Sequence, residues 1–205
     1  MKILELFSGS GIMSQTFREH GHQTLTLDSD KEADINEDIL NINPDIFFPI
    51  DIIWASPPCT TFSVASIGHH WYPNREPKTE EAKNAIKIIR KTIQIIKETK
   101  PKYWFIENPV GMLRTLHLFK DLKPLRRITV TYCQYGDTRR KPTDIWTNCP
   151  TWHPRKMCNN GDKCHIASPR GSKTGTQGLD DAFERGKLPK ELCIEIVKAC
   201  EKELK

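Results

Sequence analysis

Cys59 is placed to act as a nucleophile. It follows an apolar stretch at residues 51–55 and directly succeeds the dipeptide Pro57-Pro58. Because prolines fix φ and lack a backbone donor, this turn is stiff and displays the thiol on a rigid loop just beyond a predicted strand. A thiolate in such a position can attack an electron-poor carbon. A buried structural cysteine is the simpler alternative for this residue.

Glu107 is the second side chain whose position suggests chemistry. It follows residues 103–106, an apolar stretch that predicts another buried strand. A carboxyl group there lies at the sheet edge where open α/β proteins bind their ligands. A solvated loop glutamate is an equally consistent interpretation of this stretch when it is taken alone.

A glycine-rich turn near the N-terminus predicts a ligand site. Residues 3–7 predict a strand, Gly9 and Gly11 follow, and residues 12–20 predict a helix. This order lets a ligand approach the backbone at a helix N-terminus. A plain tight turn is the alternative, because the turn has one glycine fewer than a full dinucleotide-binding fingerprint.

Two acids follow the next predicted strand, residues 23–27. Asp28 lies at the end of that strand, about 20 residues after Gly9, the separation typical of an acid that binds a ribose diol. A helix cap or a solvated loop acid is the alternative for Asp28. Asp34 could accept a hydrogen bond from an adenine amino group, and by itself it is equally consistent with a turn.

The order of the predicted elements indicates the fold. Strands and helices alternate, which predicts an α/β protein with a doubly wound, mostly parallel sheet. The carboxyl ends of parallel strands meet at one edge, so the glycine turn, Cys59 and Glu107 should lie together there. The predicted strands are residues 3–7, 23–27, 51–55, 103–106, 126–133 and 143–147, and the predicted helices are residues 12–20, 79–100, 111–120 and 188–204.

Composition restricts the class of protein. The chain has 205 residues, enough for one substantial domain. It contains no apolar run long enough to cross a membrane and no apolar signal region, which predicts a cytoplasmic protein without a membrane partner. Seven cysteines do not form a small disulfide framework and fit a reducing compartment. The net charge of +5 permits a polyanionic partner.

Taken together, these motifs resemble those of the cytosine-5 DNA methyltransferases. They occur in the order of that family across the first 147 residues, and the pairing of Pro-Cys with Glu-Asn behind a glycine-rich turn is specific. The matching motifs are Leu6-Phe7-Ser8-Gly9-Ser10-Gly11, Asp28, Asp34-Ile35, Pro57-Pro58-Cys59 with Ser63, Glu107-Asn108-Pro109, Gln134-Tyr135-Gly136 and Arg140-Lys141.

The resemblance implies that a methyl group passes from S-adenosylmethionine to a cytosine flipped out of double-stranded DNA. Cys59 would add to C6 of the base, Glu107 would hold N3 and the exocyclic amine, and Arg140 or Lys141 would contact the carbonyl oxygen or a phosphate. Asp28 would hold the ribose and Asp34 the adenine. The implied cofactor residues are Phe7, Ser8, Gly9, Gly11, Asp28, Asp34, Ile35 and Pro57.

The chain departs from the family pattern at three points. Thr60 stands where the family usually has Gln, and the Gln-x-Arg-x-Arg element is reduced to Arg139-Arg140-Lys141. A short segment replaces the large target-recognition domain. An RNA cytosine-5 methyltransferase is therefore one alternative, and a non-catalytic nucleic-acid binder is another. The compact size resembles enzymes of bacteriophages and mobile elements, which suggests a monomer in a bacterial or phage-infected cell.

The segment that replaces the recognition domain is rich in cysteine and histidine. Cys149, Cys158 and Cys164 could bind a structural Zn²⁺, with His153 or His165 as the fourth ligand. A polar loop with chance cysteines is the alternative. We therefore divide the chain into a catalytic domain (1–148), a Cys/His-rich segment with a basic glycine-rich loop (149–178), and a C-terminal helix that packs on the catalytic domain (179–205).

Overall fold

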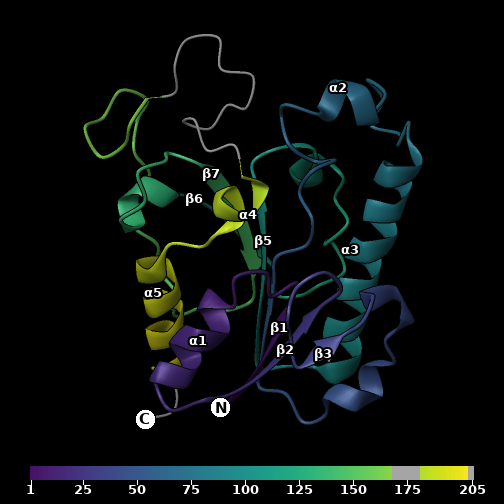
Figure 1. The fold of residues 1–205 in the computed structure, drawn as a ribbon, viewed down its shortest axis with the longest axis vertical. Helices are drawn as coiled ribbons and strands as arrows, with labels where there is room; N and C mark the ends of the chain where they lie inside the picture. The colour runs from purple at the N-terminus through teal and green to yellow at the C-terminus, as the bar shows by residue number, and fades with distance from the viewer. Residues whose placement is uncertain (168–180, 203–205) are drawn as a thin grey trace.

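A seven-stranded sheet with the order β3-β2-β1-β4-β5-β7-β6 forms the centre of the computed structural model, which describes residues 1–167 and 181–202 (Figure 1). The glycine-rich loop at residues 169–178 lies outside the described residues. The strands are β1 (Lys2–Leu6), β2 (Gln23–Asp28), β3 (Ile35–Asn36), β4 (Ile52–Ala55), β5 (Tyr103–Pro109), β6 (Arg126–Thr131) and β7 (Pro142–Thr147).

Five helices of the described residues surround this sheet. They are α1 (Ile12–Glu19), α2 (Ile67–His70), α3 (Glu80–Thr99), α4 (Ala182–Gly186) and α5 (Lys190–Glu201). Short 3-10 turns connect them, namely η1 (Ile39–Asn41), η2 (Pro44–Phe47), η3 (Met112–Thr115) and η4 (Tyr132–Tyr135). Among the residues described, no helix has the length and apolar character that a membrane crossing requires.

The predicted doubly wound, mostly parallel sheet is confirmed. Strands β1 to β5 run parallel, and β7 pairs antiparallel with both β5 and β6. The chain leaves β1 towards β2 on one side, and β4 occupies the other side, so the strand order reverses between β1 and β4. Ligands of open α/β sheets bind at such a point, outside the carboxyl ends of the strands.

The central strands are buried on both faces because their side chains alternate between two apolar cores. In β4, Ile53 belongs to one core, whereas Ile52 and Trp54 belong to the other. Helix α3 covers the first face of the sheet, and α1 and α5 cover the second (Figure 1). This period of two along strands that lack a solvent face is typical of parallel sheets between helices.

Helix α3 forms as its sequence predicts. The Thr79 hydroxyl accepts a hydrogen bond from the Ala82 backbone amide at 3.3 Å, which caps the helix, and Lys100 ends it in the left-handed conformation. The buried side of the helix is the predicted apolar stripe, which includes Ile89 and Ile96.

The predicted helix at residues 111–120 is wrong. Only the short turn η3 forms there, and His117 takes a positive φ of 51° that a helix cannot accommodate. Contacts with distant residues override the helical pattern. Arg114 forms an ion pair with the buried Asp144 of β7, and Leu113 and Phe119 both enter the core on the α3 face.

The loop that carries Cys59 is held against the end of β5 by close backbone contact at Gly111. The Met112 amide donates to the Phe62 carbonyl at 2.8 Å, and Ser63 and Gly111 form an isolated β-bridge. A Cβ atom on Gly111 would lie 2.1 Å from the Phe62 carbonyl oxygen, so only glycine allows this approach.

We therefore predict that Gly111→Ala displaces the Cys59 loop, because the new methyl group collides with backbone that cannot rotate away. The free energy of unfolding should fall by roughly 1–3 kcal/mol in chemical denaturation, as for other overpacked sites. Gly68→Ala in α2 is the matched control, since a Cβ atom there meets nothing within 4 Å. Equal stability of the two variants would contradict the close backbone contact between Gly111 and Phe62.

Candidate functional site

Cys59 lies at the carboxyl edge of the sheet, in the loop that follows β4, as predicted. Its side chain is half-buried, and its carbonyl oxygen accepts hydrogen bonds from the amides of Phe62 and Ser63, each at 3.0 Å. The neighbouring loop residue Pro57 is tied to β5, because the Asn108 side-chain amide donates to the Pro57 carbonyl at 3.0 Å. The loop therefore holds the thiol in one place relative to the strand that carries Glu107.

Glu107 is buried among hydrogen-bond donors. The Tyr132 hydroxyl donates to Glu107 Oε1 at 2.8 Å, and the Ser56 hydroxyl acts to lower the pKa of the carboxyl group. Ser56 is oriented in turn by the Trp54 indole, whose Nε1 donates to its Oγ at 2.8 Å. Burial raises the pKa of Glu107, which favours the protonated form of the carboxyl group.

One lysine acts on both reactive groups. Burial raises the pKa of Cys59, the positive charge of Lys141 opposes that rise, and the Glu107 carboxylate adds to it. Lys141 likewise opposes the raised pKa of Glu107. The Lys141 ammonium lies 4.6 Å from the centre of the Tyr132 ring. The structure thus brings Cys59, Glu107 and Lys141 into one electrostatic unit, which matches the predicted convergence.

Arg140, the other basic residue predicted at this site, points towards the Cys/His-rich segment. Its guanidinium donates to the Cys158 carbonyl at 3.5 Å. Lys141, and not Arg140, is therefore the cation of the pair whose charge reaches Cys59.

Helix α4, which the sequence did not predict, closes over the same edge. Lys141 Nζ donates to the Arg185 carbonyl at 3.0 Å, and the buried Arg139 donates to that oxygen at 2.9 Å and to the Glu184 carbonyl at 3.2 Å. Arg139 is also ion-paired with Asp137. Two basic residues of the reduced arginine motif thus bind the end of α4, where backbone carbonyls favour positive charge.

The glycine turn after β1 is shaped by Asp28. The carboxylate accepts hydrogen bonds from the backbone amide of Gly9 at 2.8 Å and from the amides of Asp30 and Lys31 at 2.9 and 3.0 Å. Phe7, Gly9 and Gly11 all take a positive φ, so the chain turns sharply here. Most acceptor sites of Asp28 are occupied by this turn, and its first role is to hold the loop.

A pocket of about 350 Å³ opens beside this turn and the Cys59 loop. Phe7, Leu27 and Ile39 line it. Pro58 and Thr60, which flank Cys59 in the sequence, line it as well. The remaining residues that line it are Ser29, Asp30, Glu37, Asp38, Thr61, Glu81, Asn84, Ala85 and Ile88. A pocket of mixed apolar and acidic character at a topological switch point is suited to a nucleoside-like ligand.

The predicted adenine contact at Asp34-Ile35 is corrected by this geometry. The Asp34 carboxylate accepts hydrogen bonds from the backbone amide and the hydroxyl of Thr26, both at 2.8 Å, and so ties β3 to β2. The pocket is lined instead by Asp38 and Ile39, four residues further on. The two Asp-Ile pairs, Asp34-Ile35 and Asp38-Ile39, are close in the sequence. The sequence alone did not show which of them lines the pocket.

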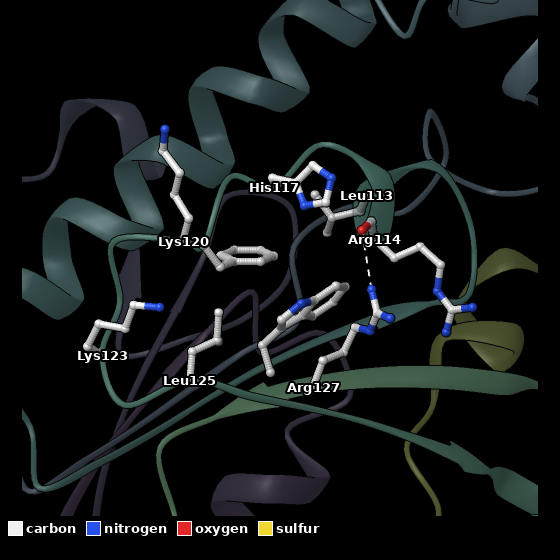
Figure 2. Close-up of a pocket in the computed structure, with 9 residues that line it drawn as sticks. Leu113, Arg114, His117, Lys120, Lys123, Leu125 and Arg127 are labelled. Carbon is white, nitrogen blue, oxygen red and sulfur yellow. Dashed lines mark hydrogen bonds between the residues drawn. The ribbon is translucent and has the colours of Figure 1, made fainter.

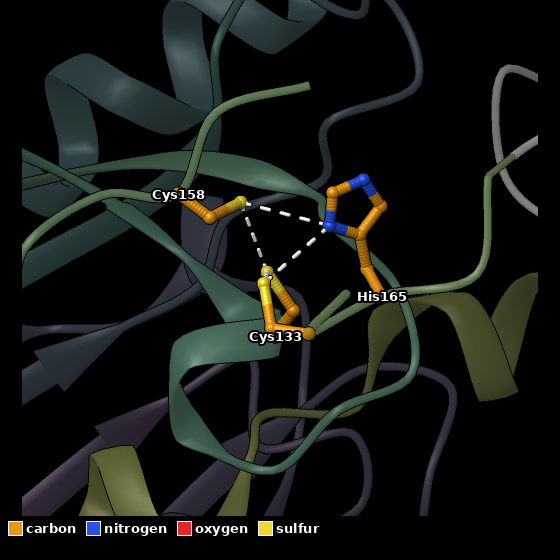
Figure 3. A group of neighbouring side chains, drawn as sticks. Cys133, Cys158 and His165 are labelled. Atoms are coloured by element: carbon orange, nitrogen blue, oxygen red, sulfur yellow. Dashed lines mark hydrogen bonds between the residues drawn. The ribbon is translucent and has the colours of Figure 1, made fainter. Parts of the chain in front are cut away.

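Three predicted ligand residues and one that the sequence did not reveal form a compact cluster (Figure 3). The ligand atoms of Cys133, Cys158, Cys164 and His165 all lie within 4.8 Å of one another. Cys133 comes from η4 and was missed because the pattern places it at the end of a predicted strand, far from the other three residues.

Cys149 and His153, which were predicted as ligands, do not belong to this cluster. The buried Cys149 thiol contacts Thr151 at 3.3 Å and bonds Cys200 of α5, and His153 is exposed. Cys149 belongs to the apolar core between the sheet and α5. Trp152 belongs to the same core and packs edge-on against Phe105, with 6.2 Å between ring centres.

A second pocket, of about 290 Å³, lies on the antiparallel side of the sheet and contains none of the predicted site residues. Figure 2 shows its basic rim and the hydrogen bond from Arg127 to the Arg114 carbonyl, which measures 3.3 Å. The lining residues are Leu113, Arg114, His117, Phe119, Lys120, Lys123, Leu125, Arg127 and Trp146. These basic side chains add to the net positive charge that suits a polyanion.

A viral protein is similar to nearly the whole of this chain. A protein of frog virus 3 (isolate Goorha), described as a probable DNA (cytosine-5)-methyltransferase, is 27% identical over 224 residues, which cover 98% of this chain and 100% of that protein.

Solved structures share the fold. A methyltransferase of Entamoeba histolytica, EhMeth, matches with a TM-score of 0.63 at 11% identity, over 100% of this chain and 99% of that one. A candidate DNA modification methyltransferase encoded within an E. coli prophage matches with a TM-score of 0.56 at 16% identity. That match covers 77% of this chain, which spans only 52% of the prophage protein.

The family model for C-5 cytosine-specific DNA methylases matches residues 1–125, the part of the chain that holds the glycine turn, Cys59 and Glu107. This match covers more than half of the 205 residues. The chain therefore belongs to the C-5 cytosine-specific DNA methylases and, as a member of that family, is a cytosine-5 methyltransferase.

Proposed function

We propose that this protein methylates C5 of a cytosine flipped out of double-stranded DNA through a covalent bond between Cys59 and C6 of the base. The observation that carries the proposal is the electrostatic coupling of Cys59, Glu107 and Lys141 at one sheet edge. A thiol, a carboxyl group that retains its proton and a fixed cation are the groups that addition to a cytosine ring requires.

The proposed reaction begins with the Cys59 thiolate. Its sulfur forms a bond to C6, the electrons of the C5–C6 double bond move towards C5 and N3, and Glu107 supplies a proton to N3. S-adenosylmethionine, when bound, supplies the methyl group that C5 receives. After methyl transfer, the N3 proton returns to the Glu107 carboxylate. Loss of the C5 proton to water then restores the C5–C6 double bond and breaks the bond between Cys59 and C6, which regenerates the thiolate.

The surroundings of Glu107 suit this role. The Tyr132 hydroxyl holds the carboxyl group, so its orientation does not depend on the substrate. Burial also raises the pKa of Tyr132 well above its usual value, which keeps its hydroxyl a donor. The hydrogen bond from Tyr132 fixes the carboxyl group and opposes the rise in its pKa, whereas burial raises that pKa and favours the protonated form.

The pocket beside Cys59 fits S-adenosylmethionine as its ligand. The Thr61 hydroxyl is buried there and has no hydrogen-bond partner among the residues described, which leaves it available to a ligand. The acids Asp30, Glu37 and Asp38 suit a ligand with hydroxyl, amino and cationic groups, and Phe7 and Ile39 suit its flat ring. Pro58 and Thr60 border this pocket, so the ligand would lie beside Cys59.

We assign DNA as the substrate, a monomer as the acting species and the cytoplasm as the compartment. The net charge of +5 and the basic pocket of Figure 2 suit a polyanion. RNA remains the alternative substrate, because only a short segment stands where a recognition domain would read the DNA sequence. We assign zinc a structural place in the Cys/His cluster and no step of the methyl transfer.

Covalent trapping tests the substrate, the donor and the nucleophile together. We expect duplex DNA that contains 5-fluorocytosine, incubated with the protein and S-adenosylmethionine, to form a stable adduct, because fluorine cannot leave as the C5 proton does. The adduct should appear as a denaturation-resistant shift in gel mobility and should be absent from Cys59→Ala.

Matched RNA with 5-fluorocytosine and the variant Cys193→Ala serve as controls, since Cys193 is a fully buried core cysteine that does not line the pocket beside Cys59. An adduct on RNA alone would move the assignment to RNA. No adduct on either nucleic acid, with normal donor binding, would identify a binding protein without catalysis.

The pH dependence of trapping tests the role of Lys141. Its positive charge opposes the rise in pKa of both Cys59 and Glu107, so Lys141→Gln should raise both pKa values. The rising limb, which reports the thiolate, and the falling limb, which reports the protonated carboxyl group, should both move to higher pH. Activity should drop in acid and be retained in alkali.

Lys187→Gln is the matched control for this profile. Lys187 also lies at α4, where it pairs with Glu184 and Phe183. A purely structural role for Lys141 would lower the rate at every pH without moving either limb, and that result would contradict the proposed electrostatic unit.

A pair of aspartates tests the revised cofactor site. We expect Asp38→Ala to weaken S-adenosylmethionine binding about tenfold in calorimetry, the effect of one lost hydrogen bond to a charged group. Asp34→Ala should instead lower the melting temperature, because Asp34 joins β3 to β2. The reverse pattern, with affinity lost in Asp34→Ala alone, would restore the original assignment.

A further inference from the structure

We propose that Cys133, Cys158, Cys164 and His165 form a tetrahedral Zn²⁺ site that fixes the Cys/His-rich segment to the base-binding side of the active site. The proposal rests on the geometry of these four side chains and does not depend on the methyl-transfer reaction.

The spacing of the four ligand atoms suits zinc. The Cys133 and Cys158 sulfurs lie 3.2 Å apart, the Cys133 and Cys164 sulfurs 3.6 Å, and His165 Nδ1 lies 3.8 and 3.5 Å from the Cys158 and Cys164 sulfurs (Figure 3). A tetrahedron with zinc–sulfur bonds of about 2.3 Å has edges of about 3.8 Å. Three cysteines and one histidine are a common ligand set of structural zinc sites.

Groups around the cluster orient the ligands and balance their charge. The Arg140 guanidinium donates to the Cys158 carbonyl at 3.5 Å, and the Gln134 side-chain amide donates to the Cys164 sulfur at 3.3 Å. Three thiolates and an imidazole around Zn²⁺ carry a net negative charge, which the adjacent Arg140 offsets. Such donors to sulfur are the outer contacts expected of a thiolate metal site.

The segment has a physical need for the ion. Among residues 149–167 the structure shows no helix or strand, and the segment contributes few side chains to the core besides Cys149, Trp152 and Cys158. One backbone link, from the Cys158 amide to the Thr131 hydroxyl at 3.1 Å, joins it to β6 near the cluster. A metal supplies folding free energy to a segment that cannot bury enough apolar surface.

The ion would also stabilise the catalytic edge. Cys133 is the residue after Tyr132, whose hydroxyl holds Glu107, and both belong to η4. Arg140, which contacts Cys158, precedes Lys141. The zinc site thus links the segment to Tyr132, which holds Glu107, and to Lys141.

Metal analysis of the full chain tests the proposal. The protein, purified under reducing conditions and exposed to Zn²⁺, should retain one zinc ion per chain by elemental mass spectrometry. Replacement by Co²⁺ should give the thiolate charge-transfer and tetrahedral absorption bands of a site with three sulfurs. Cys164→Ser and His165→Ala should lose the ion, and because Cys164 is exposed its replacement opens no cavity in the core.

Cys149→Ser and His153→Ala are the matched controls, since both residues lie in the same segment outside the cluster. They should keep the zinc ion, and a chelator should lower the melting temperature of these controls and of the unmodified chain but not of Cys164→Ser. Three results would overturn the proposal: no uptake of Zn²⁺ or Co²⁺ by the reduced chain, equal loss of zinc in the controls, or a Cys133–Cys158 disulfide in place of the ion.

Discussion

The attachment of the Cys59 loop to β5 is the constraint on which the site depends. The buried Asn108 amide holds the Pro57 carbonyl, and the backbone of Gly111 lies against that of Phe62. Both contacts join the loop after β4 to residues just beyond Glu107, so the thiol and the carboxyl group are positioned by one rigid body. A loop free of these contacts would place its thiol correctly only part of the time, and misplacement of about 1 Å is costly in catalysis.

This placement creates an electrostatic conflict that Lys141 moderates. Burial raises the pKa of both Cys59 and Glu107, which helps the carboxyl group keep its proton but hinders formation of the thiolate. The positive charge of Lys141 lowers both pKa values. Because α4 accepts a hydrogen bond from Lys141, the position of this charge is set by a helix from the far end of the chain.

The sequence predicted the parts of the site that depend on strand order. Cys59 and Glu107 converge because each follows a buried parallel strand, and the carboxyl ends of such strands share an edge whatever the loops do. Asp34 and Asp38 could not be distinguished, because that choice depends on a hydrogen bond to Thr26 of the neighbouring strand. Cys133 was missed because its partners in the cluster lie 25 residues or more further along the chain. The expected helix at 111–120 failed where Arg114 reached Asp144.

The short segment after β7 is held by contacts with neighbouring elements and not by a core of its own. Arg155 alone bonds the Gln134 carbonyl in η4 and both Glu191 and Glu195 in α5, and its backbone amide bonds the Tyr135 hydroxyl. Arg126 of β6 binds the Cys149 carbonyl at 2.9 Å. These bonds are partly exposed, and exposed ion pairs stabilise little individually. A metal that joined Cys158, Cys164 and His165 to η4 would contribute far more, because ordering the segment would then be part of binding the ion. It follows that the orientation of Tyr132 towards Glu107 would depend on residues that lie outside the strands of the sheet.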